Sequence, residues 1–310
     1  MNTPFPHFGE IMALLAATIF AWISILFTTA GQRLGVTLVN MLRLPGAVIC
    51  LGLSHLALTG HIYPQGVPFS DQLWIGISGI VGLAIGDSAL FRAFITIGPR
   101  RSMTMMALAP IFTVSIAWGA LGEELGPWTL VGIAMVIAGV IVATRGRESG
   151  GHFANLETAV LTRGLLLALV ASVGQGLGSV FAKMGMTGTS AASVGVDPLG
   201  ATLIRLVWAA GAYGLVVLPR QNLRTFFLPL RDRVGAAAIG VAILMGPFIS
   251  VWISLVAIKN TEAGIAQVLL GTMPLLVILP SWLVYKDRPT PKMLVGVIMA
   301  VAGSGLIFLR

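Results

Sequence analysis

Ten apolar segments, bounded by Gly, Pro or charged residues, occupy most of the chain and restrict what it can fold into. They lie near residues 9–29, 35–58, 72–97, 102–121, 127–144, 163–185, 198–218, 234–257, 264–285 and 291–309. A helix that crosses the hydrocarbon core of a bilayer needs roughly 20 apolar residues. With 56% hydrophobic and 10% charged residues, the chain is too apolar for a water-soluble domain. The segments therefore predict an all-α membrane protein with ten transmembrane helices and the lipid bilayer as its solvent.

The second five segments repeat the first five in sequence, which indicates a gene duplication. Residues 127–139 (PWTLVGIAMVIAG) align with residues 291–303 (PKMLVGVIMAVAG) at an offset of 164. Because each half has an odd number of helices, the second half must enter the membrane from the side opposite to the first. The sequence therefore predicts two inverted five-helix repeats, at 9–144 and 163–309, joined by a loop at 145–162.

Basic residues lie mainly on one side of this arrangement. The loops after odd-numbered segments hold 13 of the 19 Lys and Arg residues: Arg33, Arg100, Arg101, Arg145, Arg147, Arg163, Arg220, Arg224, Arg231, Arg233, Lys286, Arg288 and Lys292. The opposite side has only Lys259 and Arg310. Because cytoplasmic loops collect Lys and Arg, this bias predicts that both termini lie outside the cytoplasm. We expect a multi-pass protein of a bacterial inner (plasma) membrane.

Charge and cysteine content exclude several other classes of protein. The net charge of +8 is spread over interhelical loops and does not form one basic face with stacking aromatics, so no nucleic-acid partner is expected. The single cysteine, Cys50, has no second cysteine for a disulfide or a Cys-based metal site. The sequence has no nucleotide-binding motif, and it predicts no cofactor and no metal.

Asp87 is the ionisable residue most deeply placed in a predicted span. An ionisable side chain near the bilayer centre costs roughly 2.5–3.5 kcal/mol on insertion scales, so it is retained when it is paired, hydrated or functional. The Asp87 carboxylate is too short to reach the interface, and it needs a cation, hydrogen-bond donors or water. It could contact a substrate, carry a coupling proton, or only form a hydrogen bond that packs two helices.

Arginines inside the spans are further candidates for substrate contacts. Arg43 and Arg205 occupy related positions in the two halves, at an offset of 162, which favours a shared role facing the bundle interior. Their guanidiniums could hold a carboxylate or a phosphate, or could bind backbone carbonyls of neighbouring helices. Arg92 is near the end of its span, where its long side chain can extend to the interface.

Uncharged residues in the middle of spans complete the candidate site. The amides of Gln175 and Gln267 need partners in hydrocarbon and can orient a polar ligand, and Trp22 and Trp252 lie away from the interfacial belt where Trp usually anchors. Prolines inside spans free backbone carbonyls, so the duplicated pair Pro110 and Pro274 is a candidate hinge.

Small residues at four-residue spacing predict close helix contacts. One such stripe contains Gly174, Gly178 and Ala182, and another contains Gly82 and Gly86. Packing within a monomer is the favoured interpretation, and a homodimer remains open.

The end of each half resembles the EamA-type members of the drug/metabolite transporter superfamily. The first half has a mid-helix Pro110, a helix-ending Gly122–Glu123 and a Gly-rich helix in AFITIGPRRSMTMMALAPIFTVSIAWGALGEELGPWTLVGIAMVIAGVIV. The second half repeats the pattern with Pro274, Asp287, Gly296 and Gly303, where Asp287 replaces the usual Glu. Trp22 and the second-helix arginines are also similar to the family. Members usually keep both termini in the cytoplasm, whereas the loop charges here predict the opposite.

The resemblance implies a secondary transporter that works by alternating access around a cavity between the repeats, with proton coupling in some members. We therefore expect a small-molecule substrate, and export of a small metabolite is the leading hypothesis.

Two other classes are kept as alternatives. Residues 76–79 match the short GxSG pattern of intramembrane serine proteases, with Ser78 as the nucleophile and His55 as the one histidine at membrane level. A passive channel or lipid scramblase is the other alternative. Channels usually show rings from repeated subunits or a filter sequence, and neither is visible.

Overall fold

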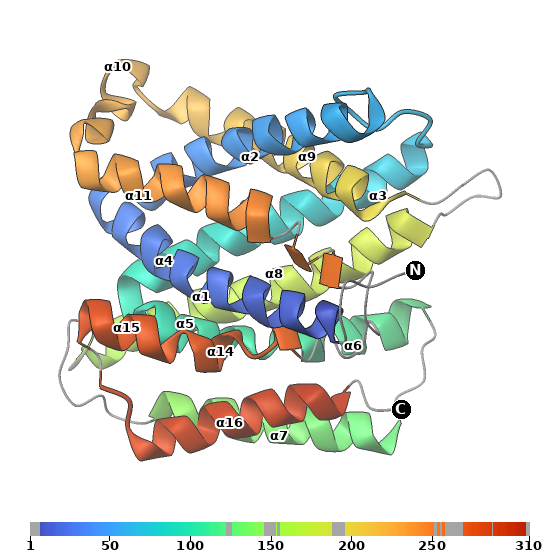
Figure 1. The fold of residues 1–310 in the computed structure, drawn as a ribbon. Helices are drawn as coiled ribbons and strands as arrows, with labels where there is room; N and C mark the ends of the chain where they lie inside the picture. The colour runs from blue at the N-terminus through green and yellow to red at the C-terminus, as the bar shows by residue number, and fades with distance from the viewer. Residues whose placement is uncertain are drawn as a thin grey trace.

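A computed structural model describes residues 7–121, 126–145, 153, 156–187, 196–250, 253–254, 256–257, 269–286 and 288–307 of the chain. Regular secondary structure in these residues is entirely helical (Figure 1). The first half contains α1 (Phe8–Leu34), α2 (Val36–Thr59), α3 (Phe69–Gly79), the π-helix η1 (Ile80–Gly86), α4 (Asp87–Ile97), α5 (Pro99–Met106), α6 (Ala109–Leu121) and α7 (Pro127–Arg145). Because α3, η1 and α4 follow one another without a break, they form a single span.

Regular secondary structure in the described residues of the second half is also entirely helical. It contains α8 (Thr158–Thr187), α9 (Pro198–Val217), η2 (Leu218–Arg220), α10 (Leu223–Phe226), η3 (Leu228–Arg231), α11 (Arg233–Ile243), the π-helix η4 (Leu244–Ser250), α14 (Met273–Leu276), α15 (Ile278–Tyr285) and α16 (Pro291–Ile307). The short helices η2, α10 and η3 connect α9 to α11.

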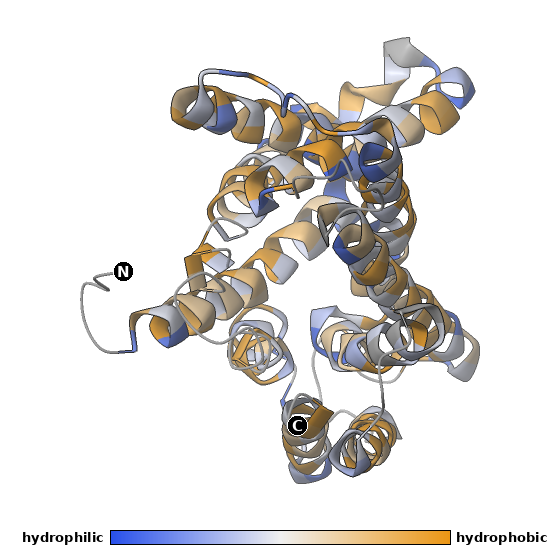
Figure 2. Cartoon of the chain, turned by 90° about the vertical axis from the view of Figure 1, so that its right-hand side faces the viewer, coloured by the Kyte–Doolittle hydropathy of each residue, from blue (hydrophilic) through white to orange (hydrophobic). Residues whose placement is uncertain are grey.

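Seven helices among the described residues are long and apolar enough to cross a membrane. They are Phe8–Leu34, Val36–Thr59, Phe69–Ile97, Pro127–Thr144, Thr158–Met186, Pro198–Arg220 and Arg233–Ser250. The interrupted pairs α5–α6 and α14–α15 and the shorter α16 occupy the other three predicted positions. Figure 2 looks along the helices and shows that they are coloured mostly as apolar all round the bundle. Many large apolar side chains are exposed, and Leu215 is 79% exposed. This distribution suits lipid as the surrounding solvent.

The last helices of the two halves, α7 and α16, lie side by side at the edge of the bundle (Figure 1). A Cβ added at Gly132 would lie 2.7 Å from the Gly303 carbonyl, and one at Gly139 would lie 2.5 Å from the Gly296 carbonyl. Contact positions thus rise along α7 as they fall along α16, so the helices are antiparallel. Since Gly132 corresponds to Gly296 and Gly139 to Gly303, related helices run in opposite directions, as inverted repeats require.

The first helix of each half packs against the third helix of the other half. On α8, Gly174 and Gly178 approach Gly86 and Gly82 so closely that an added Cβ would lie 3.1–3.2 Å from their Cα atoms. The two small-residue stripes therefore pack against each other within the monomer, as the sequence predicts. In the related contact, α1 lies against α11 and η4. This exchange interlocks the two halves.

The end of α1 is joined to the start of α11 by an ion pair. An Arg33 guanidinium nitrogen lies 2.9 Å from an Asp232 carboxylate oxygen. Asp232 also caps α11 by accepting a hydrogen bond from the Gly235 N–H. That hydrogen bond and the Arg33 guanidinium hold the pKa of Asp232 below its ordinary value.

Both third spans contain a seven-residue π-helix at the same place in the repeat. Residues 80–86 (η1) and 244–250 (η4) are related by the offset of 164 that relates α7 to α16, and Gly82 corresponds to Gly246. The Asp87 N–H donates to the Gly82 carbonyl, which is the i+5 to i bond of a π-helix. Such segments are frequent at functional sites.

The fourth helix of each half is interrupted next to its proline. Pro110 is the second residue of α6, after a turn at Ala107 and Leu108 that separates α6 from α5. Pro274 is the second residue of α14, after a turn at 271–272. A proline lacks the N–H that a helix interior needs, but it fits the first turn.

The structure corrects the expectation that Arg100 and Arg101 lie in a loop. The preceding helix ends at Gly98, which has a φ of +86°, and Pro99 then starts α5. The two arginines therefore occupy the first turn of α5, where they are only 1% and 7% exposed. An Arg101 guanidinium nitrogen donates to the Phe153 carbonyl at 3.1 Å.

The contact between α7 and α16 predicts different effects for the same substitution at two glycines. Gly139→Ala should lower the free energy of unfolding by about 1–3 kcal/mol, because the added methyl group overlaps the backbone of α16. Gly240→Ala in α11 is the matched control: no atom lies within 4 Å of its added Cβ, so stability should be unchanged or slightly raised. Thermal melting of the purified variants measures both effects, and equal melting temperatures would contradict the proposed packing.

Candidate functional site

A cavity of about 240 Å³ is lined by helices from both halves. Its walls come from α1, α2, η1, α4 and α5 of the first half and from α8, α9 and η4 of the second. Each π-helix contributes a wall residue at the related position, Leu83 in η1 and Pro247 in η4. Four of the residues that the sequence singles out line the cavity together: Arg43, Asp87, Gln175 and Arg205.

An ion pair between Arg43 and Asp87 crosses one wall of this cavity. A guanidinium nitrogen of Arg43 lies 2.9 Å from an Asp87 carboxylate oxygen, and the two side chains are only 6% and 19% exposed. Asp87 thus has the cation that an intramembrane carboxylate needs. Removing one member of a buried pair typically costs about 3–5 kcal/mol, because the other charge stays buried without compensation.

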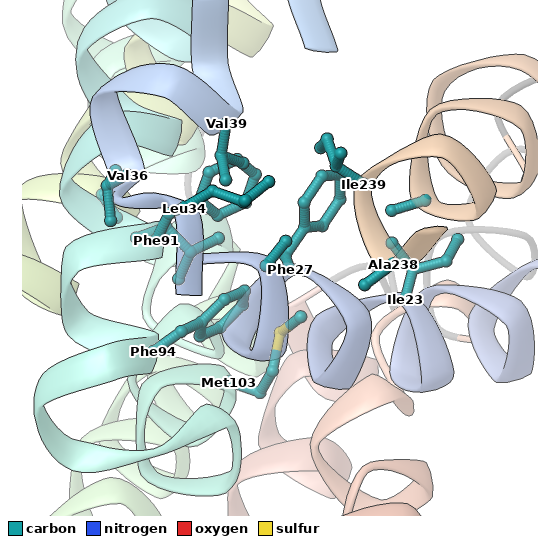
Figure 3. Packing of buried hydrophobic residues seen from close by; sticks show 14 of the residues in the cluster. Ile23, Phe27, Leu34, Val36, Val39, Phe91, Phe94, Met103, Ala238 and Ile239 are labelled. Carbon is teal, nitrogen blue, oxygen red and sulfur yellow. The ribbon is translucent and has the colours of Figure 1, made fainter. Parts of the chain in front are cut away.

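Arg43 is held by backbone and aromatic groups as well as by Asp87. The same guanidinium nitrogen donates to the Leu83 carbonyl in η1 at 3.2 Å. Its central carbon lies 5.0 Å from the ring centroid of Phe91 and 5.9 Å from that of Phe27, distances at which a cation interacts with an aromatic face. Phe27 and Phe91 stack at 4.4 Å, and Figure 3 shows them in one apolar cluster with Phe94 and Met103. Arg43 is therefore held in place by residues of its own half.

Arg205 is the related arginine of the second half, and its environment differs. Gly79 and Gly82 in the third span of the first half let α9 approach: a side chain at Gly79 would overlap the Arg205 backbone, and one at Gly82 would lie 3.4 Å from its guanidinium. Arg205 interacts electrostatically with Asp87. Its buried Nε has no hydrogen-bond partner among the described residues. Within the same residues its guanidinium forms no ion pair.

A second polar contact joins α2 to the start of α4 near the ion pair. Asn40, which is fully buried, donates from its amide nitrogen to the Ser88 hydroxyl at 3.0 Å. Ser88 in turn donates to the Ala84 carbonyl in η1. These bonds hold the helix that carries Arg43 against the helix that carries Asp87.

The other predicted site residues do not line the cavity or lie outside the described residues. Trp22 is 44% exposed on α1, and Arg92 is exposed in the middle of α4. Neither is among the cavity-lining residues. Trp252 and Gln267 lie outside the described residues, as do Glu123 and Asp287.

Several cavity residues were not singled out from the sequence. Phe20, Phe27, Phe91 and Phe94 form much of the apolar wall, but in a membrane span an apolar residue gives no signal of whether it faces lipid or a cavity. Ser24 and Thr202 also line the cavity. Their hydroxyls donate to helix carbonyls four or fewer residues earlier, so they need no partner in another helix.

The residues considered for a serine protease are not arranged for that chemistry. Ser78 is fully buried in α3, and its backbone carbonyl faces Gly178 of α8. The His55 ring contacts the Thr59 hydroxyl at 3.0 Å and the His61 carbonyl at 2.6 Å. Among the described residues, no contact joins Ser78 to His55.

Comparisons with known proteins agree with this architecture. The EamA-like transporter family matches the chain twice, at residues 7–145 and 162–309. A protein of known crystal structure has a similar fold, with a TM-score of 0.61 over 96% of this chain and 94% of that protein, at 17% sequence identity. None of the curated proteins matches the sequence significantly.

The two matched regions together cover almost the whole sequence and coincide with halves that run in opposite directions through the bundle. Members of the matched family are transporters and not enzymes, which excludes the protease interpretation. The chain therefore belongs to the EamA-like transporter family of the drug/metabolite transporter superfamily.

Proposed function

We propose that the protein is a secondary active transporter that exports a small metabolite by alternating access around the central cavity. The cavity supports this proposal most directly, because both repeats contribute to its walls and its charged residues lie in their second and third spans. In inverted-repeat transporters a site between the repeats is opened to each side in turn as one repeat moves against the other. The helix interruptions beside Pro110 and Pro274 supply matching points at which the spans can bend.

We infer further that Asp87 carries the coupling proton. It is the one carboxylate among the described cavity-lining residues, and it is paired with Arg43. Protonation of Asp87 would remove the charge that holds the Arg43 guanidinium and would weaken the link between α2 and the start of α4. Proton binding and helix movement would thereby be coupled at a single ion pair.

Counterflow in proteoliposomes tests the transport mechanism. Purified protein should exchange labelled substrate for unlabelled substrate with saturable kinetics, and an imposed pH gradient should drive net uptake. Asp87→Asn should remove the response to the pH gradient, because the amide carries no exchangeable charge, whereas Arg163→Gln, an exposed arginine in α8, should retain it. Net uptake that ignores the pH gradient in the unsubstituted protein would eliminate proton coupling.

A double-mutant cycle tests the ion pair independently of transport. Arg43→Gln and Asp87→Asn should each lower the free energy of unfolding by about 3–5 kcal/mol, because each leaves one buried charge without compensation. The double variant has lost both charges of the pair, so neither is left without the other, and it should be more stable than either single variant. Losses that simply add in the double variant would show that the two side chains do not interact.

Orientation in the membrane follows from the loop charges. We propose that both termini lie outside the cytoplasm: α1 begins and α16 ends on the same side of the bundle (Figure 1), and the described basic residues of the loops gather at the opposite ends of the helices. Such an excess of Lys and Arg is typical of cytoplasmic loops.

Cysteine labelling in intact cells measures this orientation. In a Cys50→Ala background, Gln65→Cys in the loop after α2 should react with a membrane-impermeant maleimide. Asn222→Cys in the loop before α11 should react only after the cells are permeabilised. Both side chains are exposed, so the reverse pattern would show that the termini are cytoplasmic.

A further inference from the structure

The charges that line the cavity do not balance. Its described lining contains two guanidiniums, Arg43 and Arg205, and one carboxylate, Asp87. Arg43 is matched with Asp87 in a direct ion pair. Among these described residues Arg205 is left as one surplus positive charge, and a charge in a low-dielectric cavity is strongly unfavourable unless an opposite charge lies close to it.

The duplication explains why only one of the two arginines has its own partner. Arg43 and Arg205 hold related positions in the second helix of their halves, and Asp87 follows directly after the π-helix η1. At the offset that superposes η1 on η4, the position of Asp87 corresponds to Val251 in the sequence. The second half therefore has no acidic residue at the sequence position related to Asp87.

Arg205 also has the open bonding capacity that a ligand would need. Its buried Nε has no partner among the described residues, and the guanidinium side chain lines the cavity. A guanidinium presents several N–H donors in a planar fork that matches a carboxylate. Gln175 lines the same cavity, and its amide nitrogen can donate a second hydrogen bond to a carboxylate.

The remainder of the cavity is suited to a small apolar body. Most of the other lining side chains are apolar, and they include the phenyl rings of Phe20 and Phe94. A volume of about 240 Å³ is space for about eight water molecules at their share of liquid volume. It is below the common range for drug-sized ligands.

Resting on the proposed transport function, we propose that the substrate is a small monocarboxylate with an apolar body, whose carboxylate pairs with Arg205 as Asp87 pairs with Arg43. One negative charge neutralises the lining. A neutral or zwitterionic solute leaves the surplus charge in place, and a phosphate monoester, with a charge of about −1.5 to −2 at pH 7, overshoots it. The carboxylate that pairs with Arg43 thus belongs to the protein, and the carboxylate that pairs with Arg205 belongs to the substrate.

Four probes of similar shape and different charge test this proposal on protein purified in detergent micelles: phenylacetate, phenylacetamide, 2-phenylethylamine and phenyl phosphate. Calorimetric titration at pH 7 and constant ionic strength should show phenylacetate binding at least tenfold more tightly than each of the others. Equal affinities for the acid and its amide, or a preference for phenyl phosphate, would overturn the proposal.

Substitutions locate the preference at Arg205. Arg205→Gln should weaken phenylacetate binding at least tenfold and leave phenylacetamide binding unchanged, and the control Arg163→Gln should alter neither. Arg205→Lys keeps the charge without the planar fork, so it should still prefer the acid to the amide, by a smaller factor. If Arg205→Gln does not fold, Arg205→Lys provides the test in its place. An undiminished acid preference in folded Arg205→Gln would place the anion elsewhere and overturn the assignment.

Binding in micelles and transport in vesicles separate this inference from the transport proposal. Selective, Arg205-dependent binding of phenylacetate without its counterflow would uphold the carboxylate site and count against transport. Saturable counterflow of some other solute by a protein that shows no carboxylate preference in micelles would support transport and overturn this inference alone.

Discussion

An arginine and an aspartate that are buried among membrane helices stabilise the fold only as a pair, and the site depends on this constraint. Arg43 and Asp87 both line the cavity, and their side chains are only 6% and 19% exposed. Their mutual charge compensation, the Leu83 carbonyl and two phenyl rings together replace the lost hydration. Because the pair joins α2 to the span that contains η1, the same contact that makes the charges tolerable also fixes the wall of the cavity.

Symmetry and its local loss have different roles in this molecule. The related helices α7 and α16 meet through related glycines, and this contact requires both copies to keep small residues at the same positions. The cavity is where the copies differ. The related arginines line it from both halves, but the sequence has Asp87 directly after η1 and Val251 at the related position after η4. A site made from two identical halves would suit a symmetric ligand. Asp87 makes the described lining of the cavity asymmetric, because only the arginine of the first half is paired with it.

Much of the fold could be predicted from the sequence, because hydrophobic length and the duplicated Gly and Pro positions are local signals. The predictions of an all-helical membrane protein, of two repeats and of the transporter family are confirmed. The interior arginines and Asp87 could be singled out one by one, because a charge in hydrocarbon needs a reason. That Asp87 pairs with Arg43 rather than Arg205 could not, since the choice depends on how closely two helices approach in space.

Other features were beyond the reach of the sequence for related reasons. The apolar wall residues look like any lipid-facing residue, and Arg100 and Arg101 looked like loop residues because Pro99 both ends one segment and begins the next. The π-helices gave no sequence signal either, since Gly82 and Gly246 are ordinary residues in a membrane span.

The matching π-helices also bear on the history of the protein. A π-turn holds more residues than an α-turn, so it originates when a helix gains a residue and the surrounding packing keeps its old alignment. The segments at 80–86 and 244–250 stand at equivalent places in the two halves. The extra residue was therefore already present in the single five-helix ancestor, before its gene was copied and fused.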